Sequence, residues 1–279
     1  DELLKLVEAQ AEPAQARWIA RADLAAMTAP EQGPDGGSFE DLKQDYDLRE
    51  ISTPVEAIDE DVDALVVVHP KDLSDESLFA IDQFVLRGGR VLAFLDPNSM
   101  AQAETQPAQN MQMQFAARSS NMARLLDAWG VTFDSAKVVA DLRALTMLRG
   151  PNNRAEESPV WLSLRRNHLN EDDILTGHIE SLMMPFAGAF EASSTEDLEV
   201  TTLVSSSETS SRVDAMTAQF GGDSIRRDFK SGFTRQNLAI KLHGTFETAF
   251  PDGDPASGSD EDDTVESDGE GEAVAQIGI

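Results

Sequence analysis

Two short apolar runs with a helical segment between them constrain the fold of this chain most. Ala64–Val68 and Val91–Leu95 are continuously apolar and bounded by polar residues, which is typical of strands that are covered on both faces. Ser74 can cap the helix between them, and Gly88 and Gly89 can end it, because glycine tolerates the left-handed backbone of a helix C-terminus. The pattern predicts a βαβ unit and therefore a parallel, buried sheet.

Weaker patterns predict the rest of the secondary structure. Strands are expected at residues 17–20, 47–51, 131–133, 137–140, 160–164, 198–204 and 238–242, and helices at 1–12, 39–46 and 122–129. No period persists through residues 98–120, which we interpret as an excursion from the α/β region.

These patterns divide the chain into four parts. Residues 1–14 form a helical lead-in, 15–145 an α/β domain, and 146–250 a strand-rich α+β region packed on the sheet or continuing it. Residues 251–279 contain ten acidic residues and no basic ones, so we expect an acidic flexible linker. The last residues, from Ala275, look like the beginning of a further strand at which the chain is cut off.

Composition excludes several classes of function. The chain has 279 residues, a hydrophobic content of 41% that suffices for a real core, and a net charge of -29. This charge opposes binding to nucleic acids and to anionic lipid headgroups. The absence of cysteine excludes thiol catalysis, disulfides and zinc-thiolate sites. No apolar run reaches the roughly 18 residues that span a bilayer, and the first residues are no signal peptide, so a membrane anchor is expected only in segments missing from this chain.

Polar residues follow both buried strands. His69 and Asp96 come directly after them, with Lys71 and Asn98 two residues farther on, and the carboxyl edge of a parallel sheet is where open α/β folds bind ligands. These four residues are the candidate ligand-binding site. The alternative, which we favour, is that His69 and Asp96 simply end their strands ahead of proline, with Asp96 accepting hydrogen bonds from loop amides.

No motif for catalysis, metal binding or cofactor binding is present. The sequence lacks the Gly-x-Ser-x-Gly elbow of hydrolases. His168 and His178 flank three acidic residues, a possible metal cluster, but the spacing is not that of a helical metal site and a solvated loop is the simpler interpretation. The glycines of residues 33–37 are not followed by the Gly-Lys-Ser/Thr of a phosphate-binding loop. We therefore expect no catalytic residue, metal or cofactor.

The residues of several sequence segments, and the order of these segments, resemble those of a known family. Tyr46–Ile51, Asp63–Ser74 and Ala80–Pro97 are similar to segments of the gliding-motility-type ABC transporter auxiliary components. Two later blocks of that family are similar to Trp129–Val131 with Val138–Asp141, and to Leu238–Phe246 with Ala249–Gly253. The resemblance implies a Rossmann- or flavodoxin-like α/β sheet with a topology similar to that of glutamine amidotransferases. That likeness does not extend to amidotransferase chemistry, which needs a cysteine nucleophile.

The resemblance also implies a function. It predicts a non-enzymatic auxiliary component on the periplasmic side of the cytoplasmic membrane, with the permease and ATPase subunits of an ABC transport system as partners. Three alternatives remain open from the sequence: a module that binds partner proteins or a surface polysaccharide, a receptor for a small sugar-like solute at the sheet edge, and an unrecognised hydrolase.

Overall fold

The computed structural model describes residues 17–21, 47–51, 54–99, 119–149, 155–219, 222–257 and 272–278. Its main feature is a nine-stranded sheet with the order β2-β1-β3-β4-β14-β13-β10-β5, in which β11 also pairs with β13. The expected helices at 1–12 and 39–46 lie outside the described residues, as does most of the expected excursion at 98–120.

One side of the sheet is parallel. It comprises β2 (Asp47–Ile51), β1 (Arg17–Arg21), β3 (Ala64–Val68), β4 (Arg90–Phe94) and β14 (Glu272–Gly278). The expected βαβ unit is confirmed as β3, α3 (Asp75–Leu86) and β4. The strand expected from Ala275 onward is β14, which lies inside the sheet between β4 and β13.

The other side of the sheet is antiparallel, so the sheet is mixed rather than purely parallel. It contains β5 (Thr132–Phe133), β10 (Phe190–Glu191), β11 (Leu198–Ser205) and β13 (Asn237–Thr245). β11 and β13 make the longest pairing in this part, with a register shift near Val204. Consecutive runs that alternate apolar and polar residues favour such antiparallel pairing, whereas the continuously apolar β3 and β4 favour burial on both faces.

Helix α3 begins and ends as its sequence predicts. The backbone N–H of Ser77 donates to Ser74 Oγ at 3.3 Å, which makes Ser74 the N-cap. At the other end Gly88 has a φ of +93°, and a Cβ on Gly89 would lie 2.5 Å from the ring of Phe84. Phe84 is fully buried, so the glycine pair both turns the chain and lets it pass close to this ring.

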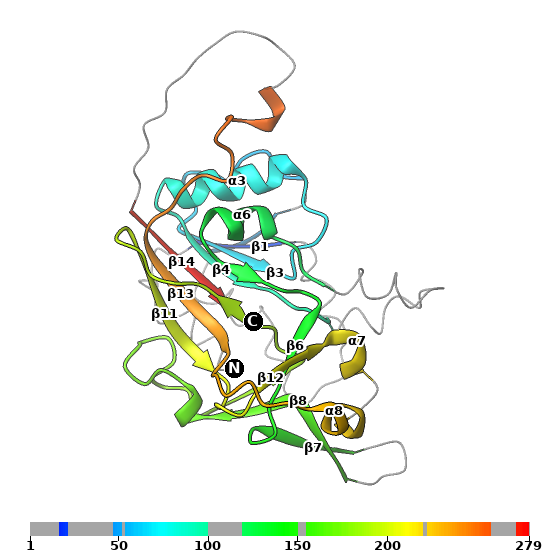
Figure 1. Cartoon of the computed structure of the whole chain (residues 1–279). Coiled ribbons are helices and arrows are strands. Elements are labelled where there is room, and N and C mark those ends of the chain that lie inside the picture. The colour runs from blue at the N-terminus through cyan, green and yellow to red at the C-terminus, as the bar shows by residue number, and fades with distance from the viewer. Residues whose placement is uncertain are drawn as a thin grey trace.

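Two helices cover one face of the sheet. α3 and α6 (Ala123–Ala128) lie side by side above it (Figure 1). Trp129 meets Phe246 at 5.5 Å between ring centroids, and Phe79 meets Phe250 at 5.3 Å, both edge to face. These contacts attach the chain after β13 to the helical layer and close the main core.

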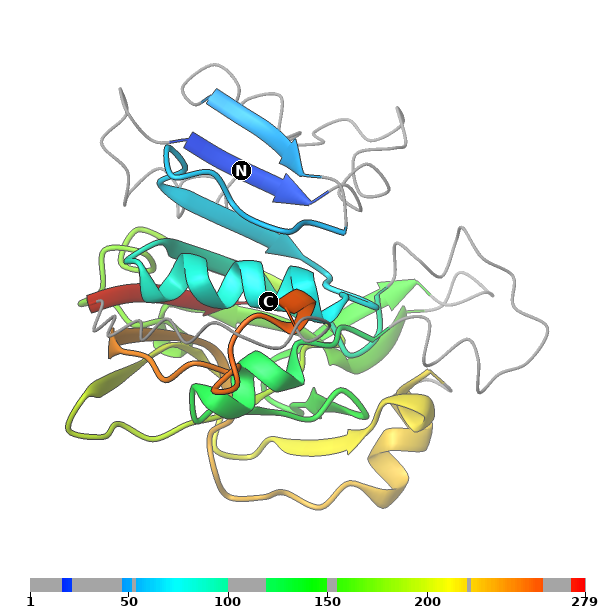
Figure 2. The ribbon, with the colours of Figure 1, turned by 90° about the horizontal axis from the view of Figure 1, so that it is seen from above.

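Two smaller sheets lie below the main sheet, on the side away from α3. One pairs β6 (Lys137–Ala140) with β12 (Ser211–Asp214), and the other joins β7 (Leu145–Arg149), β8 (Ala155–Arg165) and β9 (Ser181–Pro185). α7 (Ala215–Ala218) and α8 (Gly222–Asp228) complete this part, on the side of the molecule opposite β1 and β2 (Figure 2). The short helices η3 (Arg166–His168) and η4 (Pro255–Ser257) follow β8 and β13. No helix among the described residues is both long enough and apolar enough to cross a bilayer.

Candidate functional site

The carboxyl ends of β3 and β4 carry a buried cluster of polar residues. His69 continues the pairing of the two strands, since its N–H donates to the carbonyl oxygen of Phe94 at 2.9 Å. The chain then turns with a positive φ at His69 (+47°) and at Asp72 (+48°), a backbone region that such residues adopt only when their surroundings hold them there. His69 and Asn98 are 8% and 4% exposed.

Ser120 joins these residues, although no sequence motif indicates it. Its Oγ lies 2.9 Å from Nδ1 of His69 and accepts the backbone N–H of Asp96 at 2.7 Å. Its own N–H donates to the carbonyl oxygen of Asp96 at 2.8 Å, and the N–H of Asn121 donates to that of Pro70 at 2.7 Å. Both strand ends are therefore tied to the chain that leads into α6.

A second link connects the cluster to the lower part of the molecule. The N–H of Asn98 donates to Oδ1 of Asp96 at 2.9 Å, and the side-chain amide of Gln219 donates to Oδ1 of Asn98 at 3.1 Å. Gln219 ends α7, so this bond joins the sheet edge to the small sheet of β6 and β12. Lys71 follows on the turn after β3 and is half-buried.

Asp96 has a perturbed pKa. Burial raises the pKa of Asp96 to about 6, and the hydrogen bond from the N–H of Asn98 lowers it by a smaller amount. The raised pKa means that the folded state binds a proton here more readily than the unfolded state. The contribution of Asp96 to the free energy of unfolding is therefore greatest below the ordinary carboxyl pKa. It is lost as the pH rises through about 6.

Replacing Asp96 by asparagine should therefore stabilise the protein at neutral pH. Asparagine keeps an oxygen for the N–H of Asn98 but carries no charge, so the free energy of unfolding should rise by about 2–3 kcal/mol at pH 8 and change little near pH 4. Urea unfolding of both proteins across this range measures the difference. The same change at exposed Asp127 is the control. A gain for Asp96→Asn that does not depend on pH would contradict the assignment.

The geometry favours a structural role over nucleophilic catalysis. Ser120 and His69 are within hydrogen-bonding distance, as a nucleophile and its base must be. However, Ser120 is 3% exposed and its Oγ already accepts an amide hydrogen, so it closes a turn. The cluster is thus a latch between two strand ends, the start of α6 and the end of α7.

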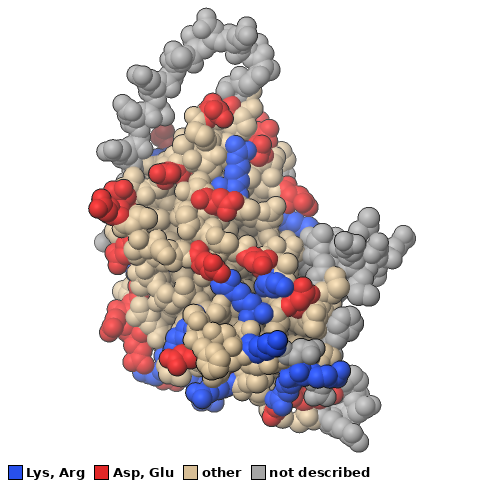
Figure 3. All heavy atoms as spheres, in the orientation of Figure 1, with Lys and Arg blue, Asp and Glu red and all other residues tan. Residues whose placement is uncertain are grey.

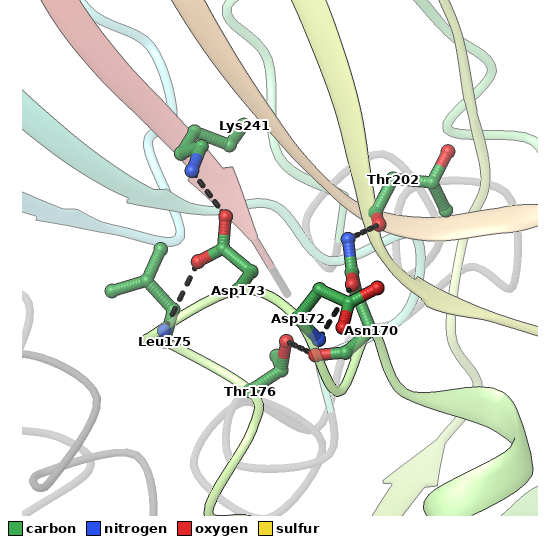
Figure 4. Close-up of polar contacts among 7 residues, drawn as sticks. All are labelled: Asn170, Asp172, Asp173, Leu175, Thr176, Thr202 and Lys241. Atoms are coloured by element: carbon green, nitrogen blue, oxygen red, sulfur yellow. Dashed lines mark hydrogen bonds and ion pairs between the residues drawn. The ribbon is translucent and has the colours of Figure 1, made fainter.

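The loop from His168 to His178, whose acidic residues suggested a metal cluster, makes contacts within the protein instead. His168 is buried with Nδ1 at 3.0 Å from the carbonyl oxygen of Ser205, while His178 is exposed. Asp173 forms an ion pair with Lys241 of β13 and accepts the N–H of Leu175 at 3.0 Å (Figure 4). In the part of the chain that the structure describes, no three His, Asp or Glu residues gather as metal ligands would.

The same loop is fastened to the sheet by Asn170. Its side-chain amide donates to the carbonyl oxygen of Thr202 at 3.2 Å, and its backbone oxygen accepts Thr176 Oγ1 at 2.6 Å (Figure 4). Its backbone N–H donates to the carbonyl oxygen of Leu203 at 2.8 Å. The loop is therefore a clamp across β11 and β13.

Comparison with known proteins assigns the chain to a family. A search of curated proteins finds no match. A solved structure described as "mmIFT52 N-terminal domain" is similar with a TM-score of 0.49 and 11% identity, over 94% of this chain and 86% of that one. The sequence profile of the family described as "ABC-type uncharacterized transport system" matches residues 21–276. The chain therefore belongs to this family of auxiliary components of ABC-type transport systems.

Proposed function

We propose that this protein is a non-enzymatic auxiliary component that acts by binding partner proteins on the periplasmic side of the cytoplasmic membrane. Its partners are the permease and ATPase subunits of an ABC transport system of the kind implicated in gliding motility. The observation that carries the protein-binding role is that the polar groups at the sheet edge already have partners within the protein. His69 and the N–H of Asp96 bond to Ser120, and Asn98 bonds to Asp96 and to Gln219. Groups that are engaged in this way are poorly placed to receive a solute.

We also propose a finer description of the fold. The five neighbouring parallel strands support a Rossmann- or flavodoxin-like half within residues 15–145, completed by β14. The strand-rich region of residues 146–250 continues that sheet through β10, β11 and β13. Under this proposal the loop ends of the sheet are closed by the latch, and the outer surfaces of the lower part make the contacts with partners.

Capture by the transporter tests this function. The protein should be retained by an affinity-tagged permease after co-expression with the ATPase and extraction in mild detergent. Retention should survive Asp96→Ala, because the change removes one hydrogen bond of the latch, from the N–H of Asn98, and the latch does not contact the partner under this proposal. Failure of the unmodified protein to be retained by an intact permease–ATPase complex would rule the function out.

One observation favours a second candidate, a receptor for a sugar-like solute at the sheet edge. A carboxyl group whose pKa is raised to about 6 lies among other polar residues at the carboxyl ends of parallel strands, a combination found at functional sites. A rise of several degrees in melting temperature with one class of sugar, abolished by Asp96→Ala, would support the receptor. Turnover of chromogenic esters or glycosides that is lost in Ser120→Ala would instead indicate a hydrolase.

A further inference from the structure

An open cleft lies in the lower part of the molecule, apart from the sheet-edge latch. It has a volume of about 540 Å³, within the size range of ligand sites. Its walls come from three places: the end of β10, the start of β12 and the chain that leads into β13. Glu191, Arg212, Arg235 and Gln236 are among the residues that line it.

The charged groups of the cleft are two arginines and one glutamate. Arg212 donates through Nε to Oε1 of Gln236 at 2.6 Å and forms an ion pair with Glu191. The side chain of Arg212 is 27% exposed, whereas that of Glu191 is 62% exposed. The protein thus holds the guanidinium in place, and the carboxylate is the partner that can move away into solvent.

The second arginine is oriented by neutral groups. Arg235 donates to the carbonyl oxygen of Asn167 at 3.3 Å and to Ser205 Oγ at 3.2 Å. These bonds orient the guanidinium. Because both acceptors are uncharged, the bonds do not neutralise its positive charge. Two oriented guanidinium groups on one cleft fit carboxylates, which they bind with two parallel hydrogen bonds.

An exposed aromatic residue, Phe233, lies in the sequence between two residues that line the cleft, Gly232 and Thr234. Phe233 is 84% exposed and has a φ of +53°, an unfavourable backbone conformation for a bulky residue. The segment from Phe229 to Asn237 carries two basic residues and no acidic one. Aromatic residues and arginine are both enriched at protein interfaces relative to the rest of the protein surface.

The location of the basic side chains favours an acidic partner at this face. In a chain with a net charge of -29, Lys and Arg gather over the lower part, around α8 and β12, whereas Asp and Glu dominate around α3 (Figure 3). An acidic segment is repelled by the rest of the molecule and steered to this face. A flat bilayer cannot enter a cleft between strands, which favours a polypeptide over lipid headgroups.

We propose that this cleft binds an acidic segment of a partner protein. Carboxylates of that segment displace Glu191 from Arg212 and pair with Arg212 and Arg235, and an apolar side chain beside them packs on Phe233. The inference rests on the proposed protein-binding function, and it gives that function a surface and a partner chemistry.

The test uses a short fluorescein-labelled peptide of alternating glutamate and leucine, with a lysine and leucine peptide as the control probe. Binding measured by fluorescence anisotropy should weaken about tenfold in Arg212→Gln, as expected for the loss of one charge-assisted pair. It should tighten about threefold in Glu191→Gln, because the competing carboxylate is gone. Arg90→Gln, an exposed arginine at the start of β4, should bind as the unmodified protein does.

The two changes on one ion pair make the test decisive. If Glu191→Gln weakens binding as much as Arg212→Gln, the pair only supports the local structure and the proposal fails. It also fails if the unmodified protein does not bind the acidic peptide, or if it binds phosphatidylglycerol vesicles in its place. If Arg212→Gln no longer binds the peptide but is still retained by the tagged permease, the permease does not use this cleft. That result would overturn this inference and leave the proposed function standing.

Discussion

Replacing Lys241 by methionine should lower the free energy of unfolding by about 3–5 kcal/mol. Asp173, the partner of Lys241, is only 7% exposed, so its carboxylate would remain in the interior without the cation that compensates it. Methionine fills a similar volume, which keeps the effect of lost packing small. Urea unfolding at pH 7, followed by tryptophan fluorescence, measures the change.

A second change on the same pair separates charge from packing. Asp173→Asn keeps an oxygen for the N–H of Leu175, so the double variant Lys241→Met with Asp173→Asn should be more stable than Lys241→Met alone by about 2 kcal/mol. The matched control is Lys137→Met. Lys137 pairs with Asp214 at 3.7 Å, and both side chains are more than 40% exposed, so its loss should cost less than about 1 kcal/mol. Equal costs for Lys241→Met and Lys137→Met would contradict the assignment.

The elements that sequence predicts well are those whose signals are local. β3, α3 and β4 follow from two apolar runs, one capping serine and a pair of glycines, all within about thirty residues of one another. The strand expected from Ala275 onward is β14, whose last residues look like a strand from the local sequence alone. Its partners are not predictable in that way, because its place between β4 and β13 depends on pairing with strands far away in the sequence. The two-residue strands β5 and β10 are too short to show any period.

The residues of the candidate site are likewise only partly predictable from the sequence. His69, Asp96 and Asn98 were identified by the rule that ligands bind at the carboxyl ends of parallel strands, and the structure brings these three together. Ser120 and Gln219 complete the cluster through contacts that span 51 and 121 positions in the sequence. Serine and glutamine are common in polar loops and short helices, so neither position stands out before the chain is folded.

Asp82 shows how a residue can be missed when it contradicts the pattern of its own helix. It lies on α3 and is fully buried, although a carboxylate in the middle of a helix is ordinarily read as part of its solvent face. The structure explains the exception. Oδ2 of Asp82 accepts Thr248 Oγ1 at 2.6 Å, and Oδ1 accepts the N–H of Ala249 at 2.9 Å. The carboxylate thereby holds the chain that follows β13 against α3.

Removing that carboxylate should release this segment. Asp82→Ala leaves the N–H of Ala249 and the hydroxyl of Thr248 without their acceptor in a buried place, so the free energy of unfolding should fall by about 3 kcal/mol. Asp82→Asn keeps one oxygen and should cost about 1 kcal/mol. Asp75→Ala is the control on the same helix, since the ion pair of Asp75 with Arg124 is exposed and worth less than about 1 kcal/mol.

Amide hydrogen exchange locates the effect of Asp82→Ala. The amides of Ala249 and Phe250 should exchange faster than in the unmodified protein, because the first loses its acceptor and the second belongs to the turn that Thr248 closes. Amides of β3 and β4 should lose protection only as far as the whole protein is destabilised, since the hydrogen bonds of Asp82 to Thr248 and Ala249 do not involve these strands. Faster exchange spread evenly over both regions would mean that Asp82 stabilises the whole core rather than fastening one segment to α3.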